Sequence, residues 1–503
     1  MKARFFSLIL GLMLLCSCSY VPSDSSSSSS SSATSSSSGD TSSSENATYS
    51  PFTLGAYALY GFHPVLSNSQ ANLTLAPLLY ESLFSVNGQF EAEPVLCDGY
   101  TVSEDGLVWT FSIRSGINFS DGTSLTGEIV ADALTLAKSP ASFYASRLSE
   151  VSSIRGTGQQ VTITLSTPNG SFPTLLDIPI ALGEGERPLG TGPYVLSETG
   201  THLSLIARSD WWQGSSQLPV WEIPLTSIGK AENLITAFDS GEVSLIDADL
   251  TGNDALGYSG SYQVWDYAST NFVYLGYNTR QGLCRDVEIR KAIAQSIDRE
   301  QICESVFARH AVEATLPVHP NSALYDTELA QSLALKSNAF EGLDLSGRSL
   351  TLLVNIENTA KSTLANLIAK QLELASGISV TVDRLPWEEY LEALSQGDFD
   401  LYLGEVSLSA DFNLTQLLSP TGTLNYGGWN NSACGAMIAS MQSSAGEERQ
   451  VAARRLYSYL NQWCPIAPIC FKNGTVLTQY GRVSNLSPVQ NNLFFHLSQW
   501  TVE

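Results

Sequence analysis

The sequence predicts an α/β fold with more than one domain. In the second half, strand-like runs alternate with helix-like runs, which is the order of a parallel sheet with crossover helices. The first half instead has Asp-Gly pairs between alternating apolar residues, which indicates antiparallel hairpins. The chain has 503 residues, more than one hydrophobic core usually supports, so two or three domains are expected.

The N-terminal segment is typical of a secreted bacterial lipoprotein. Lys2 and Arg4 precede the short apolar run Phe5–Leu15, which is too short to span a bilayer and fits a secretory signal. The "LCSC" that follows resembles a lipobox whose acceptor is Cys18. We therefore expect residues 1–17 to be a signal peptide and Cys18 to be lipidated. An ordinary cleavable signal with incidental cysteines is the alternative.

A serine-rich segment follows the predicted anchor. Sixteen of the 22 residues from Ser23 to Ser44 are serine, so this stretch has almost nothing to bury. Residues 18–48 are predicted to be a lipid anchor and flexible tether. This layout places the folded part outside the cytoplasm, anchored to the cell membrane.

The overall charge is acidic. The formal net charge is −24, which argues against a nucleic-acid partner because such binding depends on basic patches. An acidic surface mildly favours cationic ligands, although solvation alone accounts for most of it. No later segment has 18 consecutive apolar residues, so no transmembrane helix is expected.

The cysteines allow two interpretations. Six of them could form disulfides outside the cytoplasm or serve as small buried side chains: Cys97, Cys284, Cys303, Cys434, Cys464 and Cys470. The sequence has no CxxC and its five histidines are scattered, so no metal site and no cofactor are expected.

The elements of the first half read as hairpins, one helix and further strands. A hairpin over residues 106–126 is followed by a helix over 126–139, with Thr126 as its N-cap. Strands are expected at 159–168 and 202–209, on either side of a Gly-rich connector at 181–196. Residues 229–247 are expected to form a helix, which ends near Gly241, and a strand.

The second half has the β-α-β order. Strands are predicted at 271–279, 349–358, 378–385 and 397–406, with helices at 285–307, 361–377 and 387–396. In open α/β sheets, ligands bind outside the carboxyl ends of the strands.

Asp411 lies just past the last of these strands, in the stretch Gly404–Ser419. This stretch carries Glu405 and Asp411 but no Lys, Arg or His. An unpaired buried carboxylate is costly, so Asp411 needs a partner. It is a candidate for ligand binding; a local turn, in which Asp411 bonds to the nearby backbone, is the alternative.

Common enzyme motifs are absent. The sequence contains no HExxH, no GxSxG and no GxxxxGK[ST], which would position a metal, a nucleophile or a phosphate. We therefore predict that the chain is not an enzyme.

Several blocks together resemble one family. The segments Pro77–Leu134, Leu189–Leu196 ("LGTGPYVL") and Leu275–Ile302 ("LGYNTRQGLCRDVEIRKAIAQSIDREQI") are similar, in order, to the extracellular solute-binding proteins of family 5. These are the oligopeptide, dipeptide and nickel receptors of ABC importers. The resemblance extends from about Asn72 to the C-terminus.

The resemblance implies a large, two-lobed periplasmic-binding-protein-like fold of class II. This fold would have an inserted third subdomain and two crossover strands between the lobes. The crossovers are expected near Tyr267–Asn278 and Ile469–Leu477. The implied parts are lobe I (49–75, 187–268 and 475–503), the inserted subdomain of lobe I (76–186) and lobe II (269–474).

The resemblance also implies a function and a site. The chain would be a monomeric, lipid-anchored receptor that captures peptides between closing lobes and delivers them to the permease subunits of an ABC importer. In oligopeptide receptors an Ala-Asp-Tyr segment supplies an Asp for the peptide's α-amine, and "SADFN" (409–413) resembles it, which assigns this role to Asp411. The candidate pocket residues beside it are Ser409, Phe412, Trp387, Tyr426 and Trp429. The family's following Asp-Pro and preceding Trp are missing, so a non-peptide solute, such as a nickel chelate or an oligosaccharide, is the alternative.

Overall fold

The computed structural model describes residues 51–57, 60–67, 69–252 and 257–503. The predicted signal peptide, Cys18 and the whole of the serine-rich tether lie outside these residues. Residues from Phe52 onward form one compact unit. Within the described part of the chain, no helix has both the length and the apolar character needed to cross a membrane.

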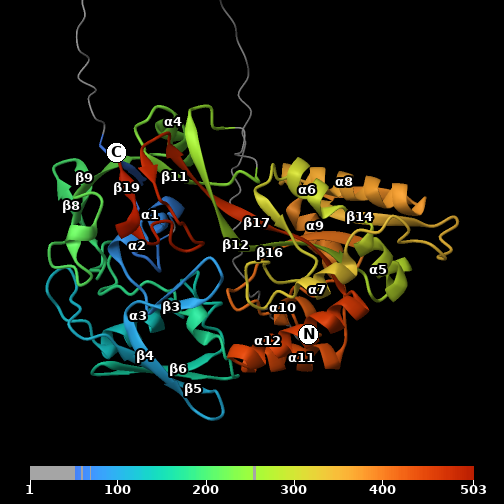
Figure 1. Cartoon of the computed structure of the whole chain (residues 1–503), viewed down its shortest axis with the longest axis horizontal. Coiled ribbons are helices and arrows are strands. Elements are labelled where there is room, and N and C mark those ends of the chain that lie inside the picture. Colours follow the sequence, from blue (N-terminus) through green and yellow to red (C-terminus); the bar gives the residue numbers. More distant parts are fainter. Residues whose placement is uncertain (1–50, 58–59, 68, 253–256) are drawn as a thin grey trace, which may run out of the picture. The chain divides into compact units, whose positions relative to one another are not determined.

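A large mixed sheet is the centre of this unit (Figure 1). Among the described residues it has eleven strands. In spatial order they are β15 (Ser379–Leu385), β14 (Ser349–Asn355), β16 (Leu401–Ser407), β12 (Tyr262–Tyr277), β17 (Ile466–Gln479), β11 (Leu245–Ala248), β1 (Leu54–Ala56), β10 (Glu222–Ser227), β9 (His202–Ala207) and β8 (Tyr194–Thr199), with β13 (Ala311–Glu313) beside β17.

Two long strands, β12 and β17, connect the two halves of this sheet. They pair antiparallel with each other, with a register shift between Tyr267 and Asn271. Beyond this shift β12 pairs with β16 on one side, whereas the last residues of β17 pair with β11 on the other. The prediction of a two-lobed α/β fold with two crossover strands is therefore confirmed. The exact lobe boundaries stay predictions.

The second half has the predicted parallel order. Strands β14 and β15 pair in parallel, and α8 (Thr359–Ser376) connects them. Asn358 caps α8 at its start and Gly377, in the left-handed conformation, ends it. Helix α9 (Trp387–Gln396) then leads to β16, which is parallel to β14.

The long helix predicted at 285–307 is wrong, because the structure divides it into two. Helix α5 (Val287–Gln295) ends before Ser296, and α6 (Arg299–Ser305) starts anew. The carboxylate of Asp298 accepts a hydrogen bond from the backbone N–H of Gln301, so this residue is an N-cap and not part of a continuous helix.

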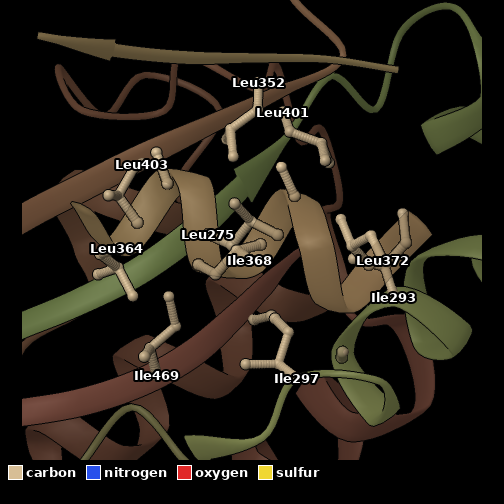
Figure 2. Packing of buried hydrophobic residues seen from close by; sticks show 14 of the residues in the cluster. Leu275, Ile293, Ile297, Leu352, Leu364, Ile368, Leu372, Leu401, Leu403 and Ile469 are labelled. Carbon is tan, nitrogen blue, oxygen red and sulfur yellow. The ribbon is translucent and has the colours of Figure 1, made fainter. Parts of the chain in front are cut away.

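Helices cover both faces of the sheet in the second half. On one face, Leu364, Ile368 and Leu372 of α8 pack onto the strands (Figure 2). On the other face, α11 (Ser432–Ser443) and α12 (Gly446–Trp463) pack around Phe272 and Phe471. Because both faces are covered, the ends of the strands are the places left for a ligand.

The first half adds a separate antiparallel sheet. Its strands, in order, are β4 (Cys97–Val102), β5 (Val108–Ile113), β7 (Gln160–Leu165) and β6 (Val151–Thr157). Helix α3 (Gly127–Ala137) packs on it and starts at the predicted N-cap Thr126. The remaining elements are the hairpin β2 (Phe84–Val86) and β3 (Ala92–Pro94), the pair β18 (Val483–Ser484) and β19 (Thr501–Val502), and the helices α1 (Gln70–Thr74), α2 (Ala76–Leu79), α4 (Ala231–Asp239), α7 (Thr327–Ala330) and α10 (Thr415–Leu418).

The six cysteines of the described residues are all buried thiols, and no disulfide joins them there. Burial raises the pKa of Cys464 to about 11, so this thiol stays protonated and packs as a small apolar side chain.

Candidate functional site

Asp411 is buried, and its partners lie within the chain. The residue follows β16 in the sequence and is 3% exposed. One carboxylate oxygen accepts a hydrogen bond from the side-chain amide of Asn169 at 2.9 Å, and the other accepts one from the hydroxyl of Ser409. Asn169 belongs to the predicted inserted subdomain, so Asp411 contacts a segment 242 positions away in sequence.

Arg449 supplies the positive charge that the stretch around Asp411 lacks. From α12 its guanidinium donates to the backbone carbonyl of Asp411 at 2.6 Å and to that of Met441 at 2.9 Å. Burial lowers the pKa of Arg449, and the charge of Asp411 partly offsets this effect. The arginine therefore holds the backbone of Asp411 in place while leaving its carboxylate to Asn169 and Ser409.

Phe412 is part of an aromatic group and does not face solvent. Its backbone has a φ of +50°, and its ring is 1% exposed. The ring centroid lies 5.0 Å from that of Phe90 and 6.1 Å from that of Phe471. His319 joins the same group, 5.0 Å from Phe90. Phe412 thus fills the space on the α11 and α12 side of the sheet.

A second polar group, here called the charged cluster, surrounds Glu405. The cluster comprises Glu405, Lys361, Lys472, Asn271 and Asn355. One carboxylate oxygen of Glu405 accepts from Nζ of Lys472 at 3.0 Å and from the amide of Asn271 at 3.1 Å. The other oxygen lies 3.7 Å from Nζ of Lys361, which also donates to Asn355 at 3.3 Å.

The ions of the charged cluster stabilise one another. Burial opposes the charge of Glu405, but the two ammonium groups outweigh it and lower the pKa of this carboxyl. Burial also opposes the charge of Lys472, but the attraction of Glu405 outweighs it and raises the pKa of this lysine. Burial lowers the pKa of Lys361 and Glu405 offsets only part of this effect. Lys361 is therefore the least compensated ion of the cluster.

The charged cluster lies where the fold predicts a ligand. Asn355 ends β14, Glu405 lies near the end of β16, and these strands are parallel, so their carboxyl ends meet at one edge. Two further acids border the cluster from outside: Asp249, 4.0 Å from Lys472 and 56% exposed, and Glu357, which is also exposed. The rim of the cluster is therefore open to solvent and acidic, whereas its centre carries two lysines.

Sequence reasoning noted Glu405 but missed its partners. Lys361 belongs to a predicted helix and was not singled out as a candidate. Lys472 was the stronger signal, because it is the single charge of the buried run 466–472 in a central strand. Such a lysine must find a carboxylate partner.

The other predicted pocket residues are spread over four places. Ser409 and Phe412 adjoin Asp411. Trp387 starts α9, where its backbone N–H donates to Glu357 at the rim of the charged cluster, 2.7 Å away. Tyr426 packs edge-on against Tyr402.

Trp429 lies in a different surrounding, against Arg290 and Trp463. These residues line a hollow of about 480 Å³ next to Thr279, which follows the carboxyl end of β12. Since β12 runs antiparallel to β16, this hollow is at the other end of these strands from Glu405. The structure thus does not bring Trp429 to the charged cluster.

The charged cluster is suited to binding a charged ligand. Among the described residues no group of three or more His, Cys, Asp or Glu could hold a metal ion. The polar groups of the charged cluster are ions and amides paired with one another, which can hold a ligand with charges of both signs.

The family comparison defines the class of protein. The family described as "Bacterial extracellular solute-binding proteins, family 5 Middle" matches residues 91–425, which is more than half of the chain. The chain belongs to this family of extracytoplasmic binding proteins, and the resemblance inferred from the sequence is confirmed.

Individual relatives are distant. The chain is 23% identical to the oligopeptide-binding protein AppA of Bacillus subtilis (strain 168) over 391 residues, which cover 69% of this chain and 72% of AppA. It is 26% identical to the glutathione-binding protein GsiB of Salmonella typhi over 282 residues, covering 52% of this chain and about half, 54%, of GsiB. The solved structure of the periplasmic murein tripeptide-binding protein MppA superposes with a TM-score of 0.73 at 17% identity, covering 88% of this chain and 95% of MppA.

Proposed function

We propose that the protein is the solute receptor of an ABC importer and that it captures short peptides between its two lobes, at the charged cluster. The observation that carries this proposal is the position of two buried lysines and a buried carboxylate at the carboxyl ends of β14 and β16. The family, and the peptide or glutathione ligands named for AppA, GsiB and MppA, support it.

The charges of the cluster suit a zwitterionic ligand. Lys361 has an ammonium group whose nearest carboxylate oxygen is 3.7 Å away, beyond good hydrogen-bond distance. A ligand carboxylate would complete its coordination with charge-assisted bonds. The exposed carboxylate of Asp249 at the rim would take the ligand's ammonium group. The peptide backbone between these ends would add bonds that do not depend on sequence.

Asp411 has a weaker claim to the ligand's ammonium group than the resemblance implies. Both of its carboxylate oxygens already accept hydrogen bonds, from Asn169 and Ser409. Its role in peptide binding stays a prediction. Lipidation of Cys18, anchoring to the cell membrane, a monomeric state and delivery to permease subunits complete the proposal, and they rest on the sequence and the family.

Calorimetry with a series of short peptides tests the proposal. Lys361→Met removes the ammonium group but keeps much of the side-chain volume, and it should weaken binding of a free-carboxylate peptide by roughly 1.5–3 kcal/mol, as expected for a hydrogen bond to a charged group. The same peptide with an amidated C-terminus should bind both proteins alike. Equal binding of the free-carboxylate peptide by both proteins would disprove the role of Lys361.

A non-peptide solute is the second candidate. The absence from the sequence of the family's Asp-Pro after Asp411, and of the Trp before it, favours this alternative. A nickel chelate would have to be held through its organic ligand, because the charged cluster contains no histidine or cysteine. Elemental analysis of the purified protein tests this candidate. A result without stoichiometric nickel would exclude the nickel chelate.

A further inference from the structure

Two of the buried cysteines, Cys303 and Cys470, are in contact with each other. Cys303 is on α6 and is 8% exposed, whereas Cys470 is on β17 and is 0% exposed. The thiol of Cys303 forms a side-chain hydrogen bond with that of Cys470. Both residues belong to the apolar cluster that α8 covers. The two sulfur atoms therefore lie side by side in the interior of the protein.

A tight turn between α6 and β13 produces this contact. Ala308 and Arg309 follow α6 and have φ angles of +48° and +71°, and the backbone N–H of Arg309 donates to the carbonyl of Cys303 at 2.8 Å. Two successive left-handed residues other than glycine are strained, and they persist only where the surroundings compensate for the strain. The turn leads the chain from α6 directly back to β13, where Glu313 pairs with Cys470.

Cys464 shows how a buried thiol is arranged when it packs alone. Its Sγ donates to the backbone carbonyls of Arg290 at 3.6 Å and of Ile466 at 3.7 Å, which is the usual solution for a weak donor in a protein interior. Cys303 and Cys470 differ from it, because each of these two thiols has a second thiol as its neighbour.

We propose that Cys303 and Cys470 form a disulfide in the exported protein, which joins α6 to the crossover strand β17. The structure shows the reduced pair. The family to which the chain belongs is extracellular, and disulfides form and persist outside the cytoplasm, where no glutathione or thioredoxin pool keeps thiols reduced. In such a compartment, two neighbouring thiols are the reduced form of a cross-link. This inference does not depend on the identity of the ligand.

The cross-link forms by exchange with an external disulfide, such as that of oxidised glutathione or of a thiol oxidase. Cys303, the more exposed of the two, attacks this disulfide as a thiolate; the external S–S bond breaks, a mixed disulfide forms and one thiolate leaves. Cys470 then loses its proton and attacks Sγ of Cys303, which releases the second thiolate. The two cysteines lose two electrons and two protons, and the external disulfide becomes two thiols.

Burial decides when this exchange takes place. Burial and the neighbouring thiol raise the pKa of Cys470, and the thiolate is the reactive form. The exchange is therefore faster while the chain folds than after α6 has covered β17. Once the bond has formed, the same burial shields it from reductants. The two positions are far apart in sequence, so the bond closes a long loop and restricts the unfolded chain strongly.

Peptide mapping of the full-length protein from its source cells tests the cross-link directly. N-ethylmaleimide in denaturant, added at lysis, blocks free thiols before they can exchange, and the digest is analysed by mass spectrometry without reduction. We expect one cross-linked pair of peptides, which contains Cys303 and Cys470, and label on the four other cysteines of the folded part: Cys97, Cys284, Cys434 and Cys464. Label on both Cys303 and Cys470, or a bond from either one to a different cysteine, would overturn the proposal.

Thermal unfolding measures what the bond contributes to stability. Each protein is first treated with a phosphine reductant in mild denaturant, so that the reductant reaches the buried bond, and is then returned to buffer. The treatment should lower the Tm of the wild type by about 3 °C and leave the Tm of Cys303→Ala and of Cys470→Ala unchanged. An unchanged wild-type Tm, or equal shifts in all three proteins, would contradict the cross-link.

Cys434→Ala is the matched control for these variants. Cys434 is also 0% exposed, but it lies in the apolar cluster on the α11 and α12 face. Its truncation removes a buried thiol without breaking the proposed bond. The reductant should therefore lower the Tm of Cys434→Ala by as much as that of the wild type. Loss of the response to reductant in Cys434→Ala would assign the bond to Cys434 and overturn the proposed pair.

Discussion

The two faces of the central sheet treat a buried acid in different ways. Glu405, on the α8 face, is neutralised by two lysines of the same predicted lobe. Asp411, six residues on and on the α11 and α12 face, takes an amide from the inserted subdomain, and Arg449 reaches its backbone and not its carboxylate. The first arrangement keeps ions at an edge open to a ligand. The second uses a carboxylate to join two segments that are far apart in sequence.

The largest effect should come from breaking the ion pair of the charged cluster. Lys472→Met removes the 3.0 Å partner of Glu405 and leaves a buried carboxylate with only Lys361 and Asn271. Removing one partner of such a pair should lower the free energy of unfolding by about 3–5 kcal/mol, as measured by urea denaturation.

Lys291→Met is the matched control for this variant. Lys291 pairs with the exposed Glu288 at 3.0 Å, and loss of such a surface pair should cost about 0.5 kcal/mol. If the two variants were equally stable, the charged cluster would contribute no more than a surface ion pair.

A smaller effect should appear at His319, on the α11 and α12 face, as pH falls. Burial lowers the pKa of His319, which packs against Phe90, to about 4. The imidazole is neutral in both states above pH 6.5, and between pH 6.5 and 4 the unfolded chain binds the proton more readily. Stability should therefore decrease as pH falls through this window, by about 3 kcal/mol in total.

The measurement compares wild type with His319→Phe, which keeps an aromatic ring against Phe90. The difference in unfolding free energy between the two proteins should shrink or reverse as pH falls from 6.5 to 4. Using the difference matters because Glu81, whose pKa burial raises to about 7, contributes an opposite trend in the upper part of this window. A pH-independent difference would show that His319 does not titrate as its burial implies.

The smallest of these effects should come from Asp411 itself. Asp411→Ala leaves the Asn169 amide and the Ser409 hydroxyl without their acceptor, which should lower the free energy of unfolding by about 1–3 kcal/mol. Asp411→Asn keeps one acceptor oxygen and should cost less. Equal loss in both variants would mean that shape and not hydrogen bonding matters at this position.

Much of the fold could be predicted from the sequence, because it depends on local patterns. The β-α-β order, the N-cap at Thr126 and the end of α8 at Gly377 are all set by neighbouring residues. The split of the predicted helix at Asp298 was missed, since its apolar spacing continues through the break. The family supplied the arrangement of the lobes, which no local pattern carries.

The candidate site was harder to predict, because its partners are far apart in sequence. Asp411 was singled out correctly as an acid in need of a partner, but Asn169 is 242 positions away and has no distinguishing neighbours. Lys361 and Lys472 reach Glu405 only in the folded sheet, where α8 covers one face and β17 is separated from β16 by the single strand β12. Such contacts depend on tertiary structure, so local patterns in a single sequence do not predict them.

Native mass spectrometry of the full-length protein, purified gently from its source cells, tests the central claim most directly. The account predicts that the wild-type protein carries short peptides as added mass, and that Lys361→Met carries much less of the same peptides. A protein that carries no peptide, or a Lys361→Met variant that carries as much as wild type, would contradict peptide capture at the charged cluster.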